Sequence, residues 1–305
     1  MPRARARSGS ANGGGRNSPR HPPVLKKYGQ HFLSDRGILE GIVDALAPGA
    51  ADTVVEIGPG RGSLTEILAE RSGRLIAIEI DRALAEQLRE KYRERPHVEI
   101  VEADVLDTDL HGVVSQISIE RAAGTDRSER KPSGDFLLIG NVPYYITTPI
   151  LFKALEPPIP KRAVFLVQRE VAERIAATED TEAYGALSVN VAVVARAEQM
   201  LSVPRGAFKP PPKVDSVVIR ITPLARPLIE SQLLPAFRTF VQAAFSLRRK
   251  QMQRVLRTIR GISAETAIEI LEGAGIDPSG RPEVVSPEGF VRLFRILLED
   301  KTTAP

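Results

Sequence analysis

The stretch VVEIGPGRGSLTEIL, residues 54–68, places a β-branched run, a glycine-rich turn and a helical pattern directly one after another. Gly58, Gly60 and Gly62 allow positive φ and let the backbone approach a ligand closely. Open parallel α/β sheets bind ligands beyond the carboxyl ends of such strands. A dinucleotide fingerprint, G-x-G-x-x-G, would need Gly at position 63, where this chain has Ser. The Lys-Ser/Thr pair of a P-loop is also missing. An acid within the turn, Glu56, would also repel phosphates, so a pyrophosphate or ATP cradle fits poorly.

Strand and helix patterns alternate on both sides of this stretch. This alternation predicts an α/β fold with a parallel sheet covered on both faces. We expect residues 107–134, which are mostly polar, to form a variable surface loop with room for one short helix. The predicted strands are 53–58, 74–80, 97–104, 136–140 and 163–168, and the predicted helices are 38–47, 63–71 and 83–92.

The pattern becomes helical throughout after residue 223, where apolar residues recur at helical spacing. We therefore expect a sheet domain over 24–224 and a smaller helical domain over 225–305. Residues 1–23 are rich in Arg, Gly, Ser and Pro, with too few apolar side chains to form a core. We expect this basic tail to be disordered.

Composition excludes several classes of protein. The chain has 305 residues, 42% of them hydrophobic, and no apolar run near the ~18–20 residues that span a bilayer. Cysteine is absent, which rules out disulfides, thiolate metal sites and a cysteine nucleophile. The four histidines are scattered without metal-site spacing, so no metal is expected. The composition fits a cytoplasmic protein, and nothing in it requires a dimer.

Acidic residues stand at the ends of successive predicted strands. A carboxylate at the Glu79 position suits a ribose diol, whose two hydroxyls can both donate to it. Asp104, at the end of the next predicted strand, could accept from an adenine amino group. A ligand with a ribose and an adenine but no phosphate indicates S-adenosylmethionine. Each acid alone is more often an ordinary strand-end or helix-cap residue. Because the acids occur at the ends of successive strands, together they favour a cofactor site.

The sequence Asn141-Val142-Pro143-Tyr144 follows the fourth predicted strand and should face the same crevice. An exocyclic adenine amine is a weak nucleophile, and an Asn oxygen with one backbone carbonyl can each accept one of its N–H groups. Pro143 keeps Val142 out of the α region and so fixes the direction of the Val142 carbonyl. Tyr144 can stack on the base, which is worth about 1–3 kcal/mol. The motif predicts positioning of an amine for attack.

A cluster of basic residues lies between Ser231 and Ala264, where the chain has no Asp or Glu. Such a cluster is typical of phosphate binding by a nucleic-acid-binding protein. A solvated helix face is the alternative, although such faces usually mix both signs. The candidate RNA contacts are Arg248, Arg249, Lys250, Arg254 and Arg257, and Arg238 and Arg260 complete the cluster.

Taken together, these motifs resemble the KsgA-type small-subunit ribosomal RNA adenine dimethyltransferases. The resemblance runs from about Lys26 to Leu298, nearly the whole predicted folded chain. It implies a Rossmann-like class I S-adenosylmethionine-dependent methyltransferase sheet with a smaller all-helical C-terminal domain. The motifs that carry it, in order, are KKYGQHFLSD, EIGPGRGSLT, EIDR, EADVL, NVPYYITTPI, GAFKPPPKVDSVVIRI, AFSLRRKQMQRVL and GRPEVVSPEGF.

The resemblance also implies residue roles and a substrate. The substrate would be two adjacent adenines near the 3′ end of 16S rRNA in a 30S precursor, each methylated twice on N6. Many family members have Leu at Val142 and Asn at Tyr145. The aromatic that closes on the target base would be Phe208, beside the catalytic Asn141, Val142, Pro143 and Tyr144. The implied contacts to the donor are His31, Leu33, Gly58, Glu79, Asp104 and Asn141.

Three other functions remain open at this point. A large-subunit rRNA adenine methyltransferase that confers antibiotic resistance would share every motif up to Val218, but the RRK segment and the GRPEVVSPEGF ending favour the small-subunit type. A non-catalytic assembly or transcription factor could keep the fold, although the intact Glu79, Asn141 and Tyr144 argue against it. Nothing in the residues alone separates an RNA from a DNA adenine methyltransferase.

Overall fold

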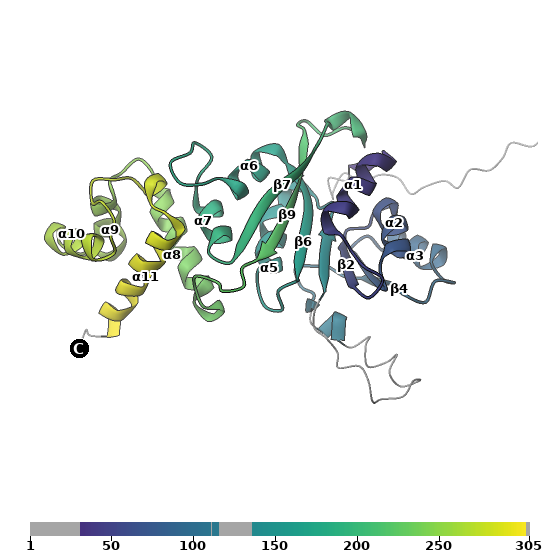
Figure 1. Cartoon of the computed structure of the whole chain (residues 1–305), viewed down its shortest axis with the longest axis horizontal. Helices are drawn as coiled ribbons and strands as arrows, with labels where there is room; N and C mark the ends of the chain where they lie inside the picture. Colours follow the sequence, from purple (N-terminus) through teal and green to yellow (C-terminus); the bar gives the residue numbers. More distant parts are fainter. Residues whose placement is uncertain (1–30, 111, 116–135, 303–305) are drawn as a thin grey trace, which may run out of the picture.

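The computed structural model describes residues 31–110, 112–115 and 136–302, and Figure 1 shows their arrangement. The predicted tail over 1–23 and most of the predicted loop over 107–134 lie outside this part. Residues 110 and 112–115 are helical, with Leu110 and Val114 buried in the core. No helix in the described ranges is long and apolar enough to cross a membrane.

A seven-stranded sheet forms the centre of the molecule, in the order β4-β3-β2-β5-β6-β9-β7. Strands β4, β3, β2, β5 and β6 are parallel, whereas β9 is antiparallel to both β6 and β7. The five predicted strands are therefore parallel, as predicted, and the antiparallel β9 and β7 at one edge make the sheet mixed. Its strands are β2 (Thr53–Ile57), β3 (Arg74–Glu79), β4 (Val98–Glu102), β5 (Leu137–Gly140), β6 (Arg162–Gln168), β7 (Ala195–Val203) and β9 (Ser216–Pro223).

Helices cover both faces of the sheet, as predicted. Alternate residues of each strand point to opposite faces, so Val54 packs in the cluster with α1, α2 and α3 while Val55 packs in the cluster on the other face. That second face is covered by α5, α6 and α7. The helices are α1 (Arg36–Leu46), α2 (Ser63–Arg71), α3 (Arg82–Lys91), α5 (Thr147–Ala154), α6 (Arg169–Ala176) and α7 (Ala186–Ala192).

Strand β7 is not predicted by the sequence pattern. Its sequence ARAEQMLSV has four charged or polar residues among nine, and residues 196–202 remain partly or fully exposed. An edge strand of this kind lacks the apolar alternation that marks a half-buried strand. Its pairing with β9, broken by an irregularity between Gln199 and Leu201, fixes it as a strand.

The helical part of the chain packs at one end of the molecule, opposite α1–α3 (Figure 1). It contains α8 (Leu234–Ser246), α9 (Met252–Arg260), α10 (Ala264–Gly273) and α11 (Pro287–Thr302). Helix α7 packs against α8 and α11. The Tyr184 ring meets Phe245 edge-on at 5.9 Å, and its hydroxyl donates to the Val285 carbonyl at 2.8 Å. The helices are thus joined to the sheet part by a shared apolar core.

Candidate functional site

A cavity of about 240 Å³ opens at the carboxyl ends of β2, β3 and β5. The chain order reverses here, because β3 and β4 lie on one side of β2 while β5 and β6 lie on the other. Such a switch point is where open α/β sheets bind ligands. Gly58, Glu79, Asp104, Asn141 and Tyr144, all predicted as site residues, line this one cavity.

The glycine-rich turn forms the floor of the cavity. Gly60 has φ +57°, and a Cβ there would lie 3.1 Å from the Phe32 ring, so a side chain would be both strained and crowded. Gly62 has φ +80°, and a Cβ would lie 2.7 Å from Leu88 of α3. The glycines therefore allow two close approaches, one to the segment that covers the cavity and one to the helix layer beneath it.

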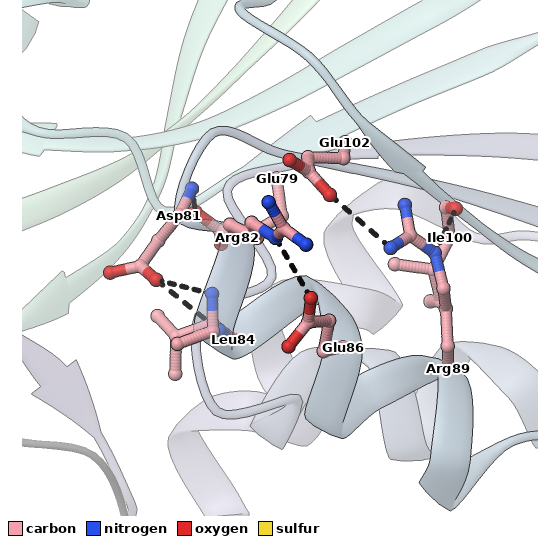
Figure 2. Close-up of polar contacts among 9 residues, drawn as sticks. Glu79, Asp81, Arg82, Leu84, Glu86, Arg89, Ile100 and Glu102 are labelled. Carbon is pink, nitrogen blue, oxygen red and sulfur yellow. Dashed lines mark hydrogen bonds and ion pairs between the residues drawn. The ribbon is translucent and has the colours of Figure 1, made fainter.

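Glu79 ends β3 with its side chain buried at the cavity wall. Its two carboxylate oxygens accept the backbone N–H groups of Gly60 and Asp81, each at 2.9 Å. Burial raises the pKa of Glu79, and these two N–H groups oppose the rise. Asp81 in turn caps α3 by accepting from the Ala83 and Leu84 amides (Figure 2). The carboxylate is thus held in one orientation, with lone pairs left for a diol.

Asp104 also lines the cavity, but not at a strand end as predicted. Strand β4 stops at Glu102, which forms an ion pair with Arg89 at 3.3 Å on the outer side (Figure 2). Asp104 lies two residues further on, where its side chain accepts from the Leu106 amide at 2.9 Å. The chain turns there, and this local hydrogen bond fixes the carboxylate.

Glu56 lies inside β2, not in the turn, and its side chain is fully buried at the cavity wall. Burial raises its pKa to about 8, opposed by the Thr65 hydroxyl and reinforced by the Glu79 carboxylate. Without a ligand, this group is mostly protonated at neutral pH. The predicted repulsion of phosphates by Glu56 requires the ionised carboxylate, which burial disfavours.

We expect Glu56→Gln to flatten the fall in stability between pH 5 and pH 8. The folded-state pKa lies above the unfolded value, so the stability contribution is complete below pH 4.5 and is lost as pH rises towards 8. At about 1.36 kcal/mol per unit, the loss approaches roughly 4 kcal/mol at pH 8. Calorimetric melting temperatures of both proteins across this pH range measure it. The exposed Glu66→Gln is the control, and parallel curves for wild type and Glu56→Gln would refute the assignment.

The target end of the cavity is built around Asn141, just after β5. Its side-chain Nδ2 donates to the His31 carbonyl at 3.3 Å, which leaves the amide oxygen available as an acceptor. Val142 is buried in the core, and Pro143 precedes the short turn Tyr144–Ile146. The amide orientation is therefore set by a residue 110 positions earlier in the chain.

Two contacts fix the Tyr144 ring. Its hydroxyl hydrogen-bonds to the Ser216 hydroxyl at 2.7 Å, and the His31 ring stacks on it with centroids 5.8 Å apart. Burial raises the Tyr144 pKa, so the hydroxyl stays neutral. Tyr145 also lines the cavity but is 63% exposed. The sequence does not indicate Ser216, because nothing local connects it with Tyr144.

A two-stranded sheet of β1 (Phe32–Leu33) and β8 (Phe208–Lys209) lies beside the cavity. The His31 Nδ1 donates to the Pro210 carbonyl at 2.8 Å, which extends the pairing. His31 and Leu33 line the cavity as predicted. Phe208 does not line it: its side chain is buried against the core that Leu33 shares. The segment implied to contact the donor, β1, is therefore paired directly with the segment implied to close on the target base, β8.

The basic cluster is only partly available for phosphate. Arg248, Arg249 and Lys250 lie in the turn between α8 and α9, not on a helix. Arg248 pairs with Glu283 at 2.8 Å and also donates to the Glu182 carbonyl. Arg238 likewise pairs with Glu156, and Arg260 donates to the Leu297 carbonyl. The exposed members are Arg248, Arg249, Lys250, Arg254 and Arg257.

The described residues contain no group of three His, Cys, Asp or Glu side chains that could hold a metal ion. The cavity instead offers a fixed carboxylate, a second carboxylate, a glycine floor and an oriented amide. Buried acceptors with closely approaching backbone suit a nucleoside. Together with the switch-point position, they define a nucleoside-binding site on a Rossmann-like sheet.

Comparisons with known proteins give the family. The model of the family "Ribosomal RNA adenine dimethylase" matches residues 24–298, and this chain belongs to that family. "Ribosomal RNA small subunit methyltransferase A" of Shouchella clausii (strain KSM-K16) is 40% identical over 90% of each chain. The protein of the same name from Acidobacterium capsulatum is 40% identical over 93% of this chain and 94% of its own. The family predicted from the motifs is confirmed.

Two solved structures extend the comparison. The 23S rRNA methyltransferase ErmE has a TM-score of 0.63 and 30% identity over 87% of this chain and 98% of its own. A dimethyladenosine transferase from Plasmodium falciparum has a TM-score of 0.71 and 24% identity over 89% and 98%. The predicted fold class, a Rossmann-like methyltransferase sheet with a helical C-terminal region, is thereby confirmed.

Proposed function

We propose that this chain transfers methyl groups from S-adenosylmethionine to N6 of two adjacent adenines near the 3′ end of 16S rRNA. The product would be N6,N6-dimethyladenosine in a 30S precursor, formed in the cytoplasm by a monomer. One observation carries the proposal: the nucleoside-type cavity around Glu79 opens onto Asn141 and Tyr144, which suit an adenine amine. The names of the curated relatives support the small-subunit substrate.

The residues of this chain would contribute mainly by positioning. The donor supplies an electrophilic methyl group. Glu79 would hold the ribose of the donor, and Asp104 would accept from its adenine amino group. Gly58 would let the backbone of the turn approach the donor closely. The Asn141 oxygen and the Val142 carbonyl would each accept one N–H of the target amine. That geometry favours a tetrahedral nitrogen with its lone pair free to attack. Tyr144 would stack on the base, and no general base is needed before attack.

Mass spectrometry of rRNA adenines tests the proposal. Small subunits that lack the modification are incubated with the protein and S-adenosylmethionine, and nucleosides from the 3′ region are analysed. We expect dimethyladenosine at two adjacent positions. A parallel reaction on large-subunit rRNA tests the rival activity, which is supported by the likeness to ErmE. Methylation of large-subunit rRNA alone would replace the proposed substrate.

We also propose that the helical part, from about residue 225, holds rRNA through phosphate contacts. Arg249, Lys250, Arg254 and Arg257 are exposed along one turn and the helix that follows it. Arg248 is half-exposed and shared with Glu283 and Glu182, so it also ties this turn to the rest of the fold. The unshared charges are the better candidates for RNA.

The double variant Arg249→Gln/Lys250→Gln removes two of these charges. We expect it to bind the small subunit more weakly, and we expect its binding constant to depend less on salt concentration. Removal of one phosphate-binding charge lowers the slope of log K against log salt by about 0.7–0.9, so removal of two lowers it by roughly 1.5. Binding titrations between about 50 and 200 mM salt measure the slope. Arg93→Gln/Arg95→Gln, two exposed arginines after α3, is the matched control. An unchanged slope would mean that the cluster is a solvated face.

A further inference from the structure

Arg61 is a cation in the glycine-rich turn, between Gly60 and Gly62, and it lines the cavity. Its Nε atom is buried and has no hydrogen-bond partner among the described residues. Buried polar atoms in native proteins are almost always hydrogen-bonded, so such an atom at a cavity wall points to a ligand. Arg61 is not among the contacts to the donor that the motifs imply.

The contact that Arg61 does make leaves its donors free. The guanidinium carbon lies 4.3 Å from the centre of the Phe32 ring. A guanidinium stacked on an aromatic face is held in place, while the N–H groups around its edge can still donate. Phe32 itself packs over Gly60. Arg61 is therefore positioned at the point where β1 covers the glycine floor.

A second unpartnered atom belongs to a carboxyl group that lines the same cavity. The Oε2 atom of Glu56 is buried without a hydrogen-bond partner in the described part of the chain. The cavity thus presents a cation and a buried carboxyl group, both unsatisfied, and a cation that approaches Glu56 lowers its pKa and favours the ionised carboxylate. A ligand segment that carries both an anion and a cation complements this pair, and an α-amino acid is such a segment.

We propose that Arg61 binds the α-carboxylate of the methyl donor and so selects donors that carry one. This inference rests on the proposed function, which makes S-adenosylmethionine the donor. The carboxylate accepts from the guanidinium edge in a charge-assisted hydrogen bond, while the ammonium end lies towards Glu56. Glu79 holds the ribose at the other end of the ligand. Arg61 is a specificity-determining residue, separate from the groups that orient the target amine.

The competing explanation is that Arg61 only holds Phe32 in place as a cover. The two explanations differ in their dependence on the ligand. A carboxylate contact contributes only to ligands that carry the carboxylate. A covering role affects every ligand of the cavity to the same extent.

Calorimetric titration with S-adenosylhomocysteine and with its decarboxylated analogue tests the proposal on the full chain. We expect the wild type to bind S-adenosylhomocysteine roughly 10- to 100-fold more tightly than the analogue, the range of a charge-assisted hydrogen bond. Arg61→Met should lose that preference by binding S-adenosylhomocysteine more weakly while binding the analogue unchanged. Arg61→Lys should retain part of it. Arg36→Met, at the exposed start of α1, is the control.

Two outcomes overturn the proposal. Equal weakening of both ligands in Arg61→Met means that Arg61 acts through Phe32, and unchanged binding of both means that it contacts neither. These outcomes leave the proposed methyl transfer intact, because it is measured independently by mass spectrometry of rRNA. Failure of the wild type to bind S-adenosylhomocysteine at all would overturn the donor assignment itself.

Discussion

Asn141→Ala is expected to lower the rate of methyl transfer by about 100- to 1,000-fold while the protein stays folded. The loss of one preorganised group that acts on the reacting centre typically has this size. The structure gives the reason: Nδ2 of Asn141 is tied to the His31 carbonyl, so the amide oxygen is held ready to accept. Alanine removes this acceptor and leaves the target amine free to rotate. Single-turnover rates of methyl incorporation into small subunits measure the effect.

Asn141→Asp separates orientation from size. The carboxylate keeps an acceptor but cannot donate to the His31 carbonyl, so two oxygens would face each other. We expect its turnover to fall almost as far as in the alanine variant. Calorimetric binding of S-adenosylhomocysteine and thermal melting report on the donor site and the fold, and we expect donor affinity to stay within about tenfold. Near-normal turnover of Asn141→Ala would disprove the role of the amide.

Glu79→Ala is expected to weaken donor binding by at least about 100-fold. Hydrogen bonds to a charged group contribute about 1.5–3 kcal/mol each, and a ribose diol would make two. The alanine also leaves the Gly60 and Asp81 amides without their carboxylate partner, which disorders the turn that forms the cavity floor. Calorimetric titration with S-adenosylhomocysteine measures the loss, and the apparent KM for S-adenosylmethionine should rise in parallel.

Glu79→Gln distinguishes the ribose contact from loss of the fold. It keeps the side-chain volume and one acceptor oxygen but turns an NH₂ group towards one of the backbone donors. A 2′-deoxy form of S-adenosylhomocysteine should bind the wild type more weakly, and the variant should discriminate less between the two ligands. Glu102→Gln, at the exposed end of the neighbouring strand β4, is the matched control. Equal discrimination by wild type and Glu79→Gln would exclude a contact with the 2′-hydroxyl.

The strand ends are predictable because parallel strands place their carboxyl ends at one edge. Gly58, Glu79 and Asn141 lie at the ends of three strands whose apolar runs are unmistakable, and they meet in one cavity. Strand β7 is not predictable, because its polar, partly exposed sequence is held in the sheet only by pairing with β9. The predicted end of β4 is two residues too late, since local hydrogen bonding at Asp104 ends the extended pattern.

The basic cluster shows the same division. The absence of acids between Ser231 and Ala264 is visible in the sequence, but the partners of its arginines come from outside that segment. Glu156, Glu283 and the Glu182 carbonyl hold Arg238 and Arg248. Charge counting alone therefore overestimates how many of these groups are free for phosphate.

The order of the motifs, the covered α/β sheet and the chemistry gathered at its strand ends all follow from the amino-acid sequence. They depend on patterns a few residues long, which local sterics and hydrophobic periodicity fix. How the groups are held depends on tertiary packing: His31 orients Asn141, Ser216 holds Tyr144, β1 pairs with β8, and Phe208 is buried beside the site. Each of these contacts joins residues far apart in the chain, so it exists only after the whole chain has packed.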